Sequence, residues 1–290
     1  MTLLLKCPSL DISDNPFFQT ISLLYKFLMR KMLVMKKFFL FFLLLLSLDA
    51  VVRRDDVADE LYIEFGLEPE FMCVGLIKGE KSTGTGTLID PYTVLTAAHV
   101  VDENPGITFH LFNPEAKEMV RVEGTPQIHE EYILIESEKG GVFQVHNDIA
   151  LIHLQSPIYF VEPAKLDYRA KAPPFNFISA GYGGTRRDSL TPFFYDLKKR
   201  GYTSSIYLFH STEYFDDFYI SGFSKENPTS RLNGFSVYGD SGSGAFFAHN
   251  RKYYLFAVLS LYVHEKDYDF NYFTPIGPYK EWIEKNRWLH

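Results

Sequence analysis

Short apolar runs fill the chain from residue 60 onward, and they limit the possible fold more than any other feature. Turn-forming glycine, proline, asparagine and aspartate residues separate the runs, and no helical pattern lies between them. The runs read FMCVGLI, GTGTLI, TVLTAAHVV, ITFHLF, DIALIHL, NFISAGYG, SIYLFH, GAFFAH, YYLFAVLSLYV and YFTPI. So many short runs without helices between them predict an all-β chain, built as an antiparallel sandwich or barrel.

The end of the chain departs from this pattern. Tyr279, Trp282 and Ile283 follow a proline and lie at the spacing of one helical face. Proline is favoured in the first turn of a helix. We therefore expect a terminal α-helix over about 279–290.

Residues 35–50, MKKFFLFFLLLLSLDA, have the build of a secretory signal peptide, with two lysines, an apolar run and the small residue Ala50. A membrane anchor is the alternative, but the apolar run 38–46 is far shorter than the about 20 residues that a spanning helix needs. We expect a secreted or periplasmic protein that keeps no stable membrane anchor after signal cleavage.

A signal peptide normally begins the chain, whereas residues 1–34 precede this one. Met32 or Met35 is therefore a candidate initiator, and residues 1–34 would then not be translated. We expect the leader 1–50 to lie outside the folded domain, which would span 51–290.

The charge of the chain bears on its partners. The formal net charge is −7 for 29 basic and 36 acidic residues, and the first 50 residues hold six of the basic and three of the acidic ones. The remainder carries 23 basic and 33 acidic residues, a net charge of −10. Such a surface disfavours nucleic acid and anionic lipid as partners.

Cysteine use excludes two kinds of stabilisation. Cys7 lies in the leader, and Cys73 lies in the strand-like segment EFMCVGLI, where an unpaired thiol packs as a small apolar residue. We therefore expect no disulfide within the mature chain and no cysteine-based metal site.

The segment YGDSGSGAFF, residues 238–247, presents Ser241 between glycines, where its hydroxyl is uncrowded. Asp240 comes directly before this serine, and a carboxylate beside a developing oxyanion would oppose the reaction. Either Ser241 is not a nucleophile, or Asp240 points away from the chemistry and has another partner.

A nucleophilic serine needs a base, and the base needs an acid that orients it. His99 follows two alanines at the end of an apolar strand, where its imidazole could face a cleft; the alternative is a histidine with satisfied hydrogen bonds at a strand end. Asp148 opens the strand DIALIHL, a place where an acid is otherwise a turn or strand-edge residue. A buried carboxylate there would need partners, and a histidine Nδ1 is a suitable one.

Together, LTAAH, NDIAL and GDSGSG, in this order, resemble the active-site motifs of the chymotrypsin-like (trypsin family) serine peptidases. The separations of 49 residues from His99 to Asp148 and 93 residues from Asp148 to Ser241 are usual for that family. GTGTLI, AGYGG, VLSLY and NYFTPI resemble further segments of the family. The resemblance covers about 51–290 and depends on the motifs together, because any one of them alone is a weak signal.

The resemblance implies a fold of two antiparallel β-barrels with the active site between them and a C-terminal α-helix. The first barrel would span about 60–160 and the second about 161–278. His99 and Asp148 would come from the first barrel, and Ser241 from the second.

The resemblance also implies catalytic roles. Ser241 Oγ would attack the scissile carbonyl, His99 would take its proton and later deliver it to the leaving amine, and Asp148 would fix the imidazole tautomer. The backbone N–H groups of Gly239 and Ser241 would form the oxyanion hole, and a glycine at 239 can adopt a conformation that aims its N–H into the cleft. The reaction would use no metal and no cofactor.

Substrate contacts are implied for six residues, namely Phe235, Ser236, Ser260, Leu261, Tyr262 and Asn271. Alignment on Ser241 puts Phe235 at the pocket floor beside Ser236, with the walls near Tyr262 and Asn271. Residues 260–262 would pair with an extended substrate as an added strand, and Ser260 would lie near Asp148. Because no carboxylate lies at the floor, we expect small or medium apolar side chains rather than Lys or Arg before the scissile bond.

One departure from the family concerns a disulfide. The two positions that would hold the cysteine pair beside the catalytic histidine are Gly84 and Val100. We expect this change to affect stability and substrate fit and not the type of reaction.

The resemblance gives Asp240 a partner. In the family, the acid before the nucleophile pairs with a newly freed apolar N-terminus, and this pair orders the oxyanion loop. Cleavage after Ala50 would expose Val51, so we expect a Val51 ammonium paired with the Asp240 carboxylate. The alternative is that Arg53, Arg54 or a water-filled cavity satisfies Asp240.

We therefore expect a monomeric serine endopeptidase that acts on protein or peptide substrates. Three alternatives remain: a catalytically silent relative that binds a partner, a secreted binding module for a host or envelope protein, and an esterase. The order Ser, acid, His of the α/β-hydrolase esterases is not met.

Overall fold

The computed structural model describes residues 52–54, 56–102, 104, 106–136, 142–183, 196, 198–210, 217–222, 230–265 and 268–288. The chain divides into two compact units, Met1–Leu48 and Asp49–His290, and the described residues all belong to the second. The predicted signal peptide 35–50, Cys7 and Val51 lie outside the described residues. Among the helices in these ranges, none combines the length and hydropathy needed to cross a bilayer.

The first barrel is a closed ring of antiparallel strands in the order β2-β3-β4-β9-β6-β5. Its strands are β2 (Val74–Lys78), β3 (Thr83–Asp90), β4 (Thr93–Thr96), β5 (Ile107–Asn113), β6 (Glu118–Ile128) and β9 (Ala150–Leu154). On β5, Ile107, Phe109 and Leu111 are buried, whereas Thr108 and His110 between them are partly exposed. This alternation turns every second side chain into the barrel core.

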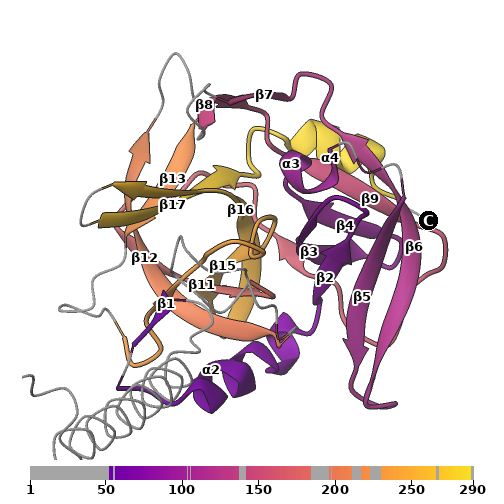
Figure 1. The fold of residues 1–290 in the computed structure, drawn as a ribbon, viewed down its shortest axis with the longest axis horizontal. Helices are drawn as coiled ribbons and strands as arrows, with labels where there is room; N and C mark the ends of the chain where they lie inside the picture. Colours follow the sequence, from indigo (N-terminus) through magenta and orange to yellow (C-terminus); the bar gives the residue numbers. More distant parts are fainter. Residues whose placement is uncertain are drawn as a thin grey trace, which may run out of the picture. The chain divides into compact units, whose positions relative to one another are not determined.

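The second barrel closes through the pairing of β16 with β17, with β10 (Lys165–Leu166) added in parallel to β16. Its strands are β11 (Phe175–Gly181), β12 (Arg200–His210), β13 (Phe218–Gly222), β15 (Gly244–His249), β16 (Lys252–Glu265) and β17 (Tyr268–Pro275). Aromatic rings fill its core, and the Phe177 and Phe273 rings meet edge-to-face with centroids 5.0 Å apart. Figure 1 places the first barrel at the right of the view and the second at the left.

Two small sheets lie outside the rings. β7 (Ile133–Glu136) and β8 (Val142–His146) form a hairpin, and β1 (Val52–Arg53) pairs with β14 (Gly234–Phe235). Val145 of the hairpin shares a core cluster with Phe218, Ile220 and Leu261. The segment that leads to Asp148 therefore packs against the second barrel.

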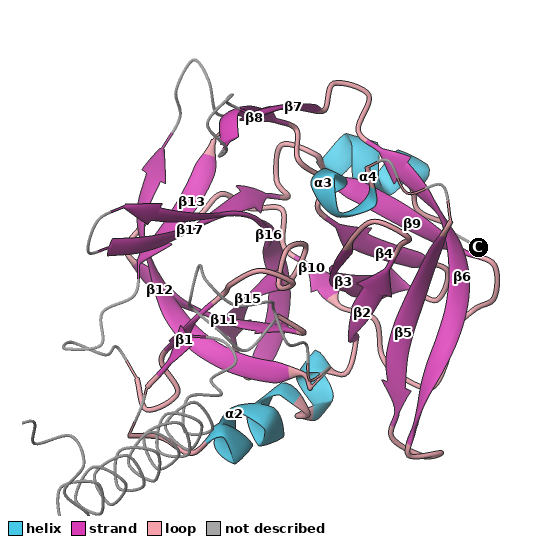
Figure 2. Cartoon of the chain, viewed as in Figure 1, coloured by secondary structure: helices cyan, strands magenta, loops and turns pink. Residues whose placement is uncertain are grey.

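The predicted fold class is confirmed: two closed six-stranded antiparallel barrels and a short C-terminal helix, α4 (Lys280–Asn286). Figure 2 shows that strands make up most of the described chain. The expectation of no helix before the end is wrong, because α2 (Asp59–Gly66), the 3₁₀ turn η2 (Pro69–Phe71) and α3 (Ala98–Val101) come earlier.

Packing explains why α2 forms although its own signals are weak. Its N-cap is Ala58, which offers no side-chain hydrogen bond, and only two of its residues are buried, Tyr62 and Gly66. Gly66 lies so close to the backbone of Arg200 and Gly201 that a Cβ would collide with it. The helix is therefore held by β12 and not by its own sequence.

Candidate active site

His99 lies in α3 and not at the end of a strand, as the sequence pattern suggested. β4 ends at Thr96, and one helical turn then carries His99. Ala97 and Ala98 are fully buried, which leaves the imidazole as the first partly exposed side chain after the strand. Its backbone N–H and its Nδ1 both face Asp148, at 3.0 Å from Oδ1 and 2.8 Å from Oδ2.

Asp148 is a buried carboxylate with donors from both barrels. The backbone N–H and Nδ1–H of His99 come from the first barrel, and Ser260 Oγ donates to Oδ2 from β16 of the second. A carboxylate only accepts, so the proton of this pair lies on Nδ1. This leaves Nε2 as the nitrogen that can take a proton from another group.

The two groups shift each other's pKa in opposite directions. Burial alone would lower the pKa of His99, but the charge and hydrogen bond of Asp148 outweigh burial, and the pKa lies above the ordinary 6.5. Burial alone would raise the pKa of Asp148, but the His99 charge and the hydrogen bonds from His99 and Ser260 hold it below its ordinary value. The site therefore favours an imidazolium beside a carboxylate.

Ser241 lies in the loop between β14 and β15. Its carbonyl accepts a hydrogen bond of 2.8 Å from the Thr85 N–H of β3 in the first barrel. Its Oγ makes no hydrogen bond to any described residue, and neither does His99 Nε2. The loop is thus tied to the first barrel through its backbone, while its hydroxyl stays available.

The loop leaves two neighbouring backbone donors without acceptors. The N–H groups of Asp240, Gly242 and Ser243 donate to the carbonyls of Val237, Leu259 and Asp240, whereas those of Gly239 and Ser241 donate to no described residue. Gly239 has φ 92° and Gly242 φ 83°, in the left-handed region that favours glycine. Such an arrangement of backbone N–H groups can stabilise a negatively charged oxygen.

Asp240 turns inward, away from Ser241. It is buried, and its carboxylate accepts the N–H of Gly183 at 2.7 Å and that of Val237 at 3.0 Å. A Cβ at Gly181 or Gly183 would collide with this carboxylate, so the AGYGG segment makes room for it. Burial raises the pKa of Asp240 to about 6, although the two N–H donors act against burial.

Aromatic rings line the expected substrate pocket. Phe235 is fully buried, and its ring meets the Tyr262 ring edge-to-face with centroids 5.8 Å apart; the exposed Tyr238 ring also meets Tyr262 edge-to-face, with centroids 5.7 Å apart. The Tyr262 hydroxyl donates to Asp269 at 2.9 Å. The three rings therefore form a row from the buried Phe235 to the exposed Tyr238.

The remaining predicted pocket residues serve the backbone and the core. The Asn271 side chain accepts the Ser236 N–H and donates to the Ser236 carbonyl, both at 3.0 Å, and the Ser236 hydroxyl bonds to Tyr202. Leu261 belongs to the core cluster that holds the β7–β8 hairpin. Asn271, expected near a pocket wall, is fully buried, and its side chain braces the backbone of Ser236.

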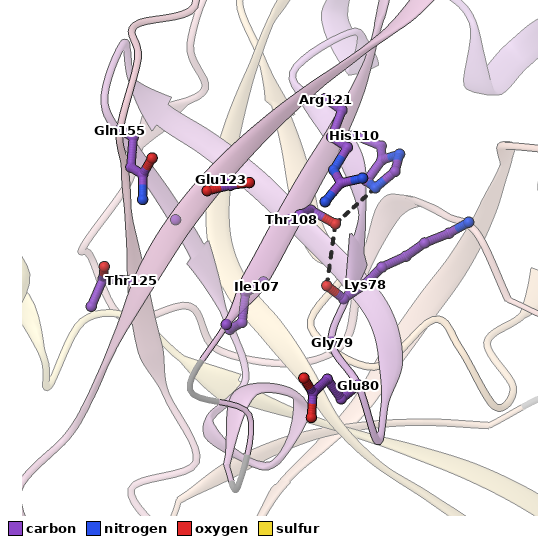
Figure 3. A pocket seen from close by; sticks show the side chains of 12 residues that line it. Lys78, Gly79, Glu80, Ile107, Thr108, His110, Arg121, Glu123, Thr125 and Gln155 are labelled. Carbon is purple, nitrogen blue, oxygen red and sulfur yellow. Dashed lines mark hydrogen bonds between the residues drawn. The ribbon is translucent and has the colours of Figure 1, made fainter.

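A separate cavity of about 590 Å³ lies on the first barrel. Basic and acidic side chains both line it, namely Lys78, Arg121, Glu80 and Glu123. The other lining residues are Gly79, Gly106, Ile107, Thr108, His110, Gly124, Thr125 and Gln155. Thr108 Oγ lies 2.9 Å from His110 Nε2 and 3.3 Å from the Lys78 carbonyl (Figure 3). None of the residues around Ser241 or His99 lines this cavity, so it does not enlarge the candidate site.

Sequence reasoning missed two contributors to the site, Thr85 and Tyr238. Both lie within segments that the motifs had singled out, GTGTLI and YGDSGSGAFF. Thr85 contacts the serine loop from the other barrel, and Tyr238 packs on Tyr262, 24 positions further along the chain. No local pattern encodes either contact. Within the described ranges, no group of three or more His, Cys, Asp and Glu side chains is arranged to hold a metal ion.

The sequence matches the family model of trypsin over residues 68–283, which includes His99, Asp148 and Ser241. Among solved structures, neuropsin, a serine protease expressed in the limbic system of mouse brain, gives a TM-score of 0.56 at 18% sequence identity. That match covers 75% of this chain and 95% of that chain, and at this identity it bears on the fold alone. No curated protein matches the sequence.

Proposed function

The chain belongs to the trypsin family of serine proteases, and from this premise we propose that it is a secreted serine endopeptidase whose catalytic residues are Ser241, His99 and Asp148. The observation that carries the proposal is the His99–Asp148 pair, with Nδ1 bonded at 2.8 Å, beside a serine loop in which two backbone N–H groups have no acceptor among the described residues. The stability of the fold does not require this arrangement of an ion pair and these backbone donors, so the arrangement supports a catalytic function.

The reaction would proceed in two halves. Ser241 Oγ attacks the scissile carbonyl while His99 Nε2 takes its proton, and Asp148 stabilises the imidazolium that results. The oxyanion accepts hydrogen bonds from the N–H groups of Gly239 and Ser241, and each such donor contributes about 3 kcal/mol to transition-state stabilisation. His99 then protonates the leaving amine, and water hydrolyses the acyl-enzyme by the same steps in reverse.

We propose further that the enzyme prefers small or medium apolar side chains before the scissile bond. The support is the aromatic row of Phe235, Tyr262 and Tyr238, which offers no anion at the floor. Asp269, a buried acid beside this row, accepts a hydrogen bond from the Tyr262 hydroxyl. A guanidinium or ammonium at the floor would lack an anionic partner.

The activation proposal concerns Asp240 and the Val51 amine that signal cleavage would free. Residues Val52 and Arg53 pair with Phe235 and Gly234, which brings the segment that follows Val51 beside the pocket. Asp240 makes no ion pair with a described residue, and a buried ammonium would supply the missing charge. N-terminal sequencing tests this: active protein that begins at Val51 supports it, and full activity with residues 48–50 retained contradicts it.

Profiling a library of peptide substrates tests the proposed function. We expect cleavage by the wild-type protein after small or medium apolar residues, and none by Ser241→Ala. Ser204→Ala is a suitable control because the Ser204 hydroxyl is buried on β12 and has no hydrogen bond to a described residue. Equal turnover in wild type and Ser241→Ala would contradict the triad, and no turnover by correctly processed wild type would favour a silent binding protein.

A further inference from the structure

Thr85 of β3 joins the first barrel to the serine loop through its side chain and its backbone. Its hydroxyl donates to the Gly239 carbonyl at 3.0 Å and accepts the Tyr182 N–H at 3.1 Å. Its own N–H donates to the Ser241 carbonyl at 2.8 Å. One fully buried residue therefore contacts both ends of the segment that carries the two unused donors.

The hydroxyl fixes the peptide group that links Gly239 to Asp240. The carbonyl of this group accepts from Thr85, and its N–H donates to the Val237 carbonyl at 3.0 Å. Gly239 has no Cβ to restrict its rotation, so the direction of its N–H depends on how firmly the next peptide group is held. Without the Thr85 hydroxyl, that group would keep a single anchor.

Neighbouring groups keep Thr85 in place. Thr96 Oγ donates to the Thr85 carbonyl at 2.9 Å. Gly242 approaches the same carbonyl so closely that a Cβ would collide with it and with Thr96 Oγ. Strands β3 and β4 thus form a rigid support against which the loop is pressed.

We propose that Thr85 is a positioning residue, which holds the N–H groups of Gly239 and Ser241 in the orientation that an oxyanion requires. This inference rests on the proposed function. Thr85 acts through the loop and touches neither substrate nor the reacting atoms. It should therefore affect transition-state binding more than substrate binding.

The test compares variants that lack the hydroxyl with one that keeps it. Thr85→Val preserves the size of the side chain and Thr85→Ala removes it, whereas Thr85→Ser retains the hydroxyl. In both hydroxyl-free variants, kcat per titrated active site should fall about tenfold with KM within about twofold, because transition-state interactions appear in kcat. Thr85→Ser should stay within about threefold of wild type.

Thr87→Val is the matched control. Thr87 lies two residues further on the same strand, is equally buried, and its hydroxyl has no hydrogen bond to a described residue. It should leave kcat unchanged. A peptide aldehyde, whose adduct carries the oxyanion, should lose affinity for Thr85→Val by the same factor as kcat/KM, while a product-like peptide should bind unchanged.

Equal kcat in Thr85→Val, Thr85→Ala and wild type would overturn the inference, and so would equal losses in Thr85→Val and Thr87→Val. If Thr85→Val does not fold, the pair Thr85→Ser and Thr85→Ala differs only by the hydroxyl and decides the question. Wild-type protein that turns over no substrate and binds no serine reagent would overturn the proposed function and the inference with it, so the two failures are distinguishable.

Discussion

At the scale of single residues, Asp148 is the member of the candidate site that accepts hydrogen bonds from both barrels. It receives two donors from His99 in the first barrel and one from Ser260 in the second. Loss of the Ser260 hydroxyl should therefore weaken the orientation of the His99 imidazole. Loss of the Asp148 carboxylate, the acceptor of the Nδ1–H, should abolish that orientation.

Asp148→Asn should lower kcat by about 10⁴-fold, because an amide at this position favours the wrong imidazole tautomer. Ser260→Ala should lower kcat only about tenfold or less, since Asp148 keeps both bonds to His99. Steady-state kinetics on one peptide substrate checks both. A Ser260→Ala loss as large as that of Asp148→Asn would contradict this division of roles.

The pH dependence of activity and of stability should run in opposite directions near neutrality. The pKa of His99 is raised above 6.5, and catalysis needs the neutral imidazole, so kcat/KM should fall on acidification with a midpoint above 6.5. A raised pKa contributes stability that is present below the unfolded value and is lost as pH rises through the folded value. A kcat/KM midpoint clearly below 6.5 would contradict the assignment of His99.

Unfolding measurements supply the second half of this test. Wild type should lose stability as pH rises through the folded pKa of His99, and His99→Ala should not show this loss. Chemical denaturation at several pH values compares the two proteins. Identical pH profiles would mean that the His99–Asp148 pair does not form in solution.

Members of the candidate site could be named from the sequence where a motif carries them and not where a tertiary contact does. His99, Asp148 and Ser241 could be named from LTAAH, NDIAL and GDSGSG. The brace that Asn271 provides for Ser236 could not, because it joins residues 35 positions apart through a buried side chain. The hydrogen bond from the Thr85 hydroxyl to the Gly239 carbonyl spans 154 positions, and in the sequence Thr85 is indistinguishable from any other threonine of a strand.

At the scale of elements, the loop 237–243 begins two residues after β14, and β14 pairs with β1 near the start of the domain. The loop holds the buried Asp240, whose carboxylate accepts a hydrogen bond from the Val237 N–H. The proposed pairing of the Val51 ammonium with Asp240 would therefore join the start of the domain to this loop.

The stability of the uncleaved chain should fall as pH rises from 3.8 to about 6, because burial raises the pKa of Asp240 over that range. The loss amounts to about 3 kcal/mol at about 1.4 kcal/mol per pKa unit. In a chain that begins at Val51, the ammonium would favour the carboxylate and this loss should disappear. Chemical unfolding between pH 4 and pH 7 compares the two forms, and equal slopes would contradict the pairing of Val51 with Asp240.

Arg200 fastens helix α2 to the second barrel and should matter for stability. Its buried guanidinium bonds to Asp59 of α2 at 2.8 Å and to Asp196 at 2.7 Å. Arg200→Met should lower the free energy of unfolding by about 3 kcal/mol, the lower end for a buried pair, because both carboxylates are partly exposed.

Urea denaturation measures this loss, with Lys252→Met as the control. Lys252 is an exposed basic residue on β16 that makes no ion pair with a described residue, so its loss should change stability little. Equal effects of the two substitutions would mean that α2 does not depend on Arg200.

Strands were more predictable than early helices for a physical reason. A strand that lines a barrel shows its burial in its own sequence, as Ile107, Phe109 and Leu111 do on β5. Helix α2 shows little of this, since its stability comes from contacts with residues about 140 positions away. The one-turn helix α3 was hidden in the same way, because its residues continue the apolar run of β4.

At the scale of the whole molecule, the active site exists only where the two barrels are correctly joined. Polar contacts at this joint include Ser260 to Asp148, Thr85 to the serine loop, and the buried Lys199, whose Nζ donates to the carbonyls of Phe71 and Val74. The fold class and the family followed from the strand pattern and the three motifs. The proposed substrate preference depends on ring contacts between distant positions, such as Phe235 with Tyr262, so the sequence alone could not define it.

Covalent labelling by a fluorophosphonate, followed by peptide mapping, tests the central claim most directly. This reagent reacts with a serine hydroxyl only when a base activates it and an oxyanion site stabilises the product. We expect stoichiometric labelling of the peptide that contains Ser241, and none in Ser241→Ala or His99→Ala. Absence of labelling in the mature wild-type protein, or a label on another residue, would contradict the assignment of Ser241 as the nucleophile.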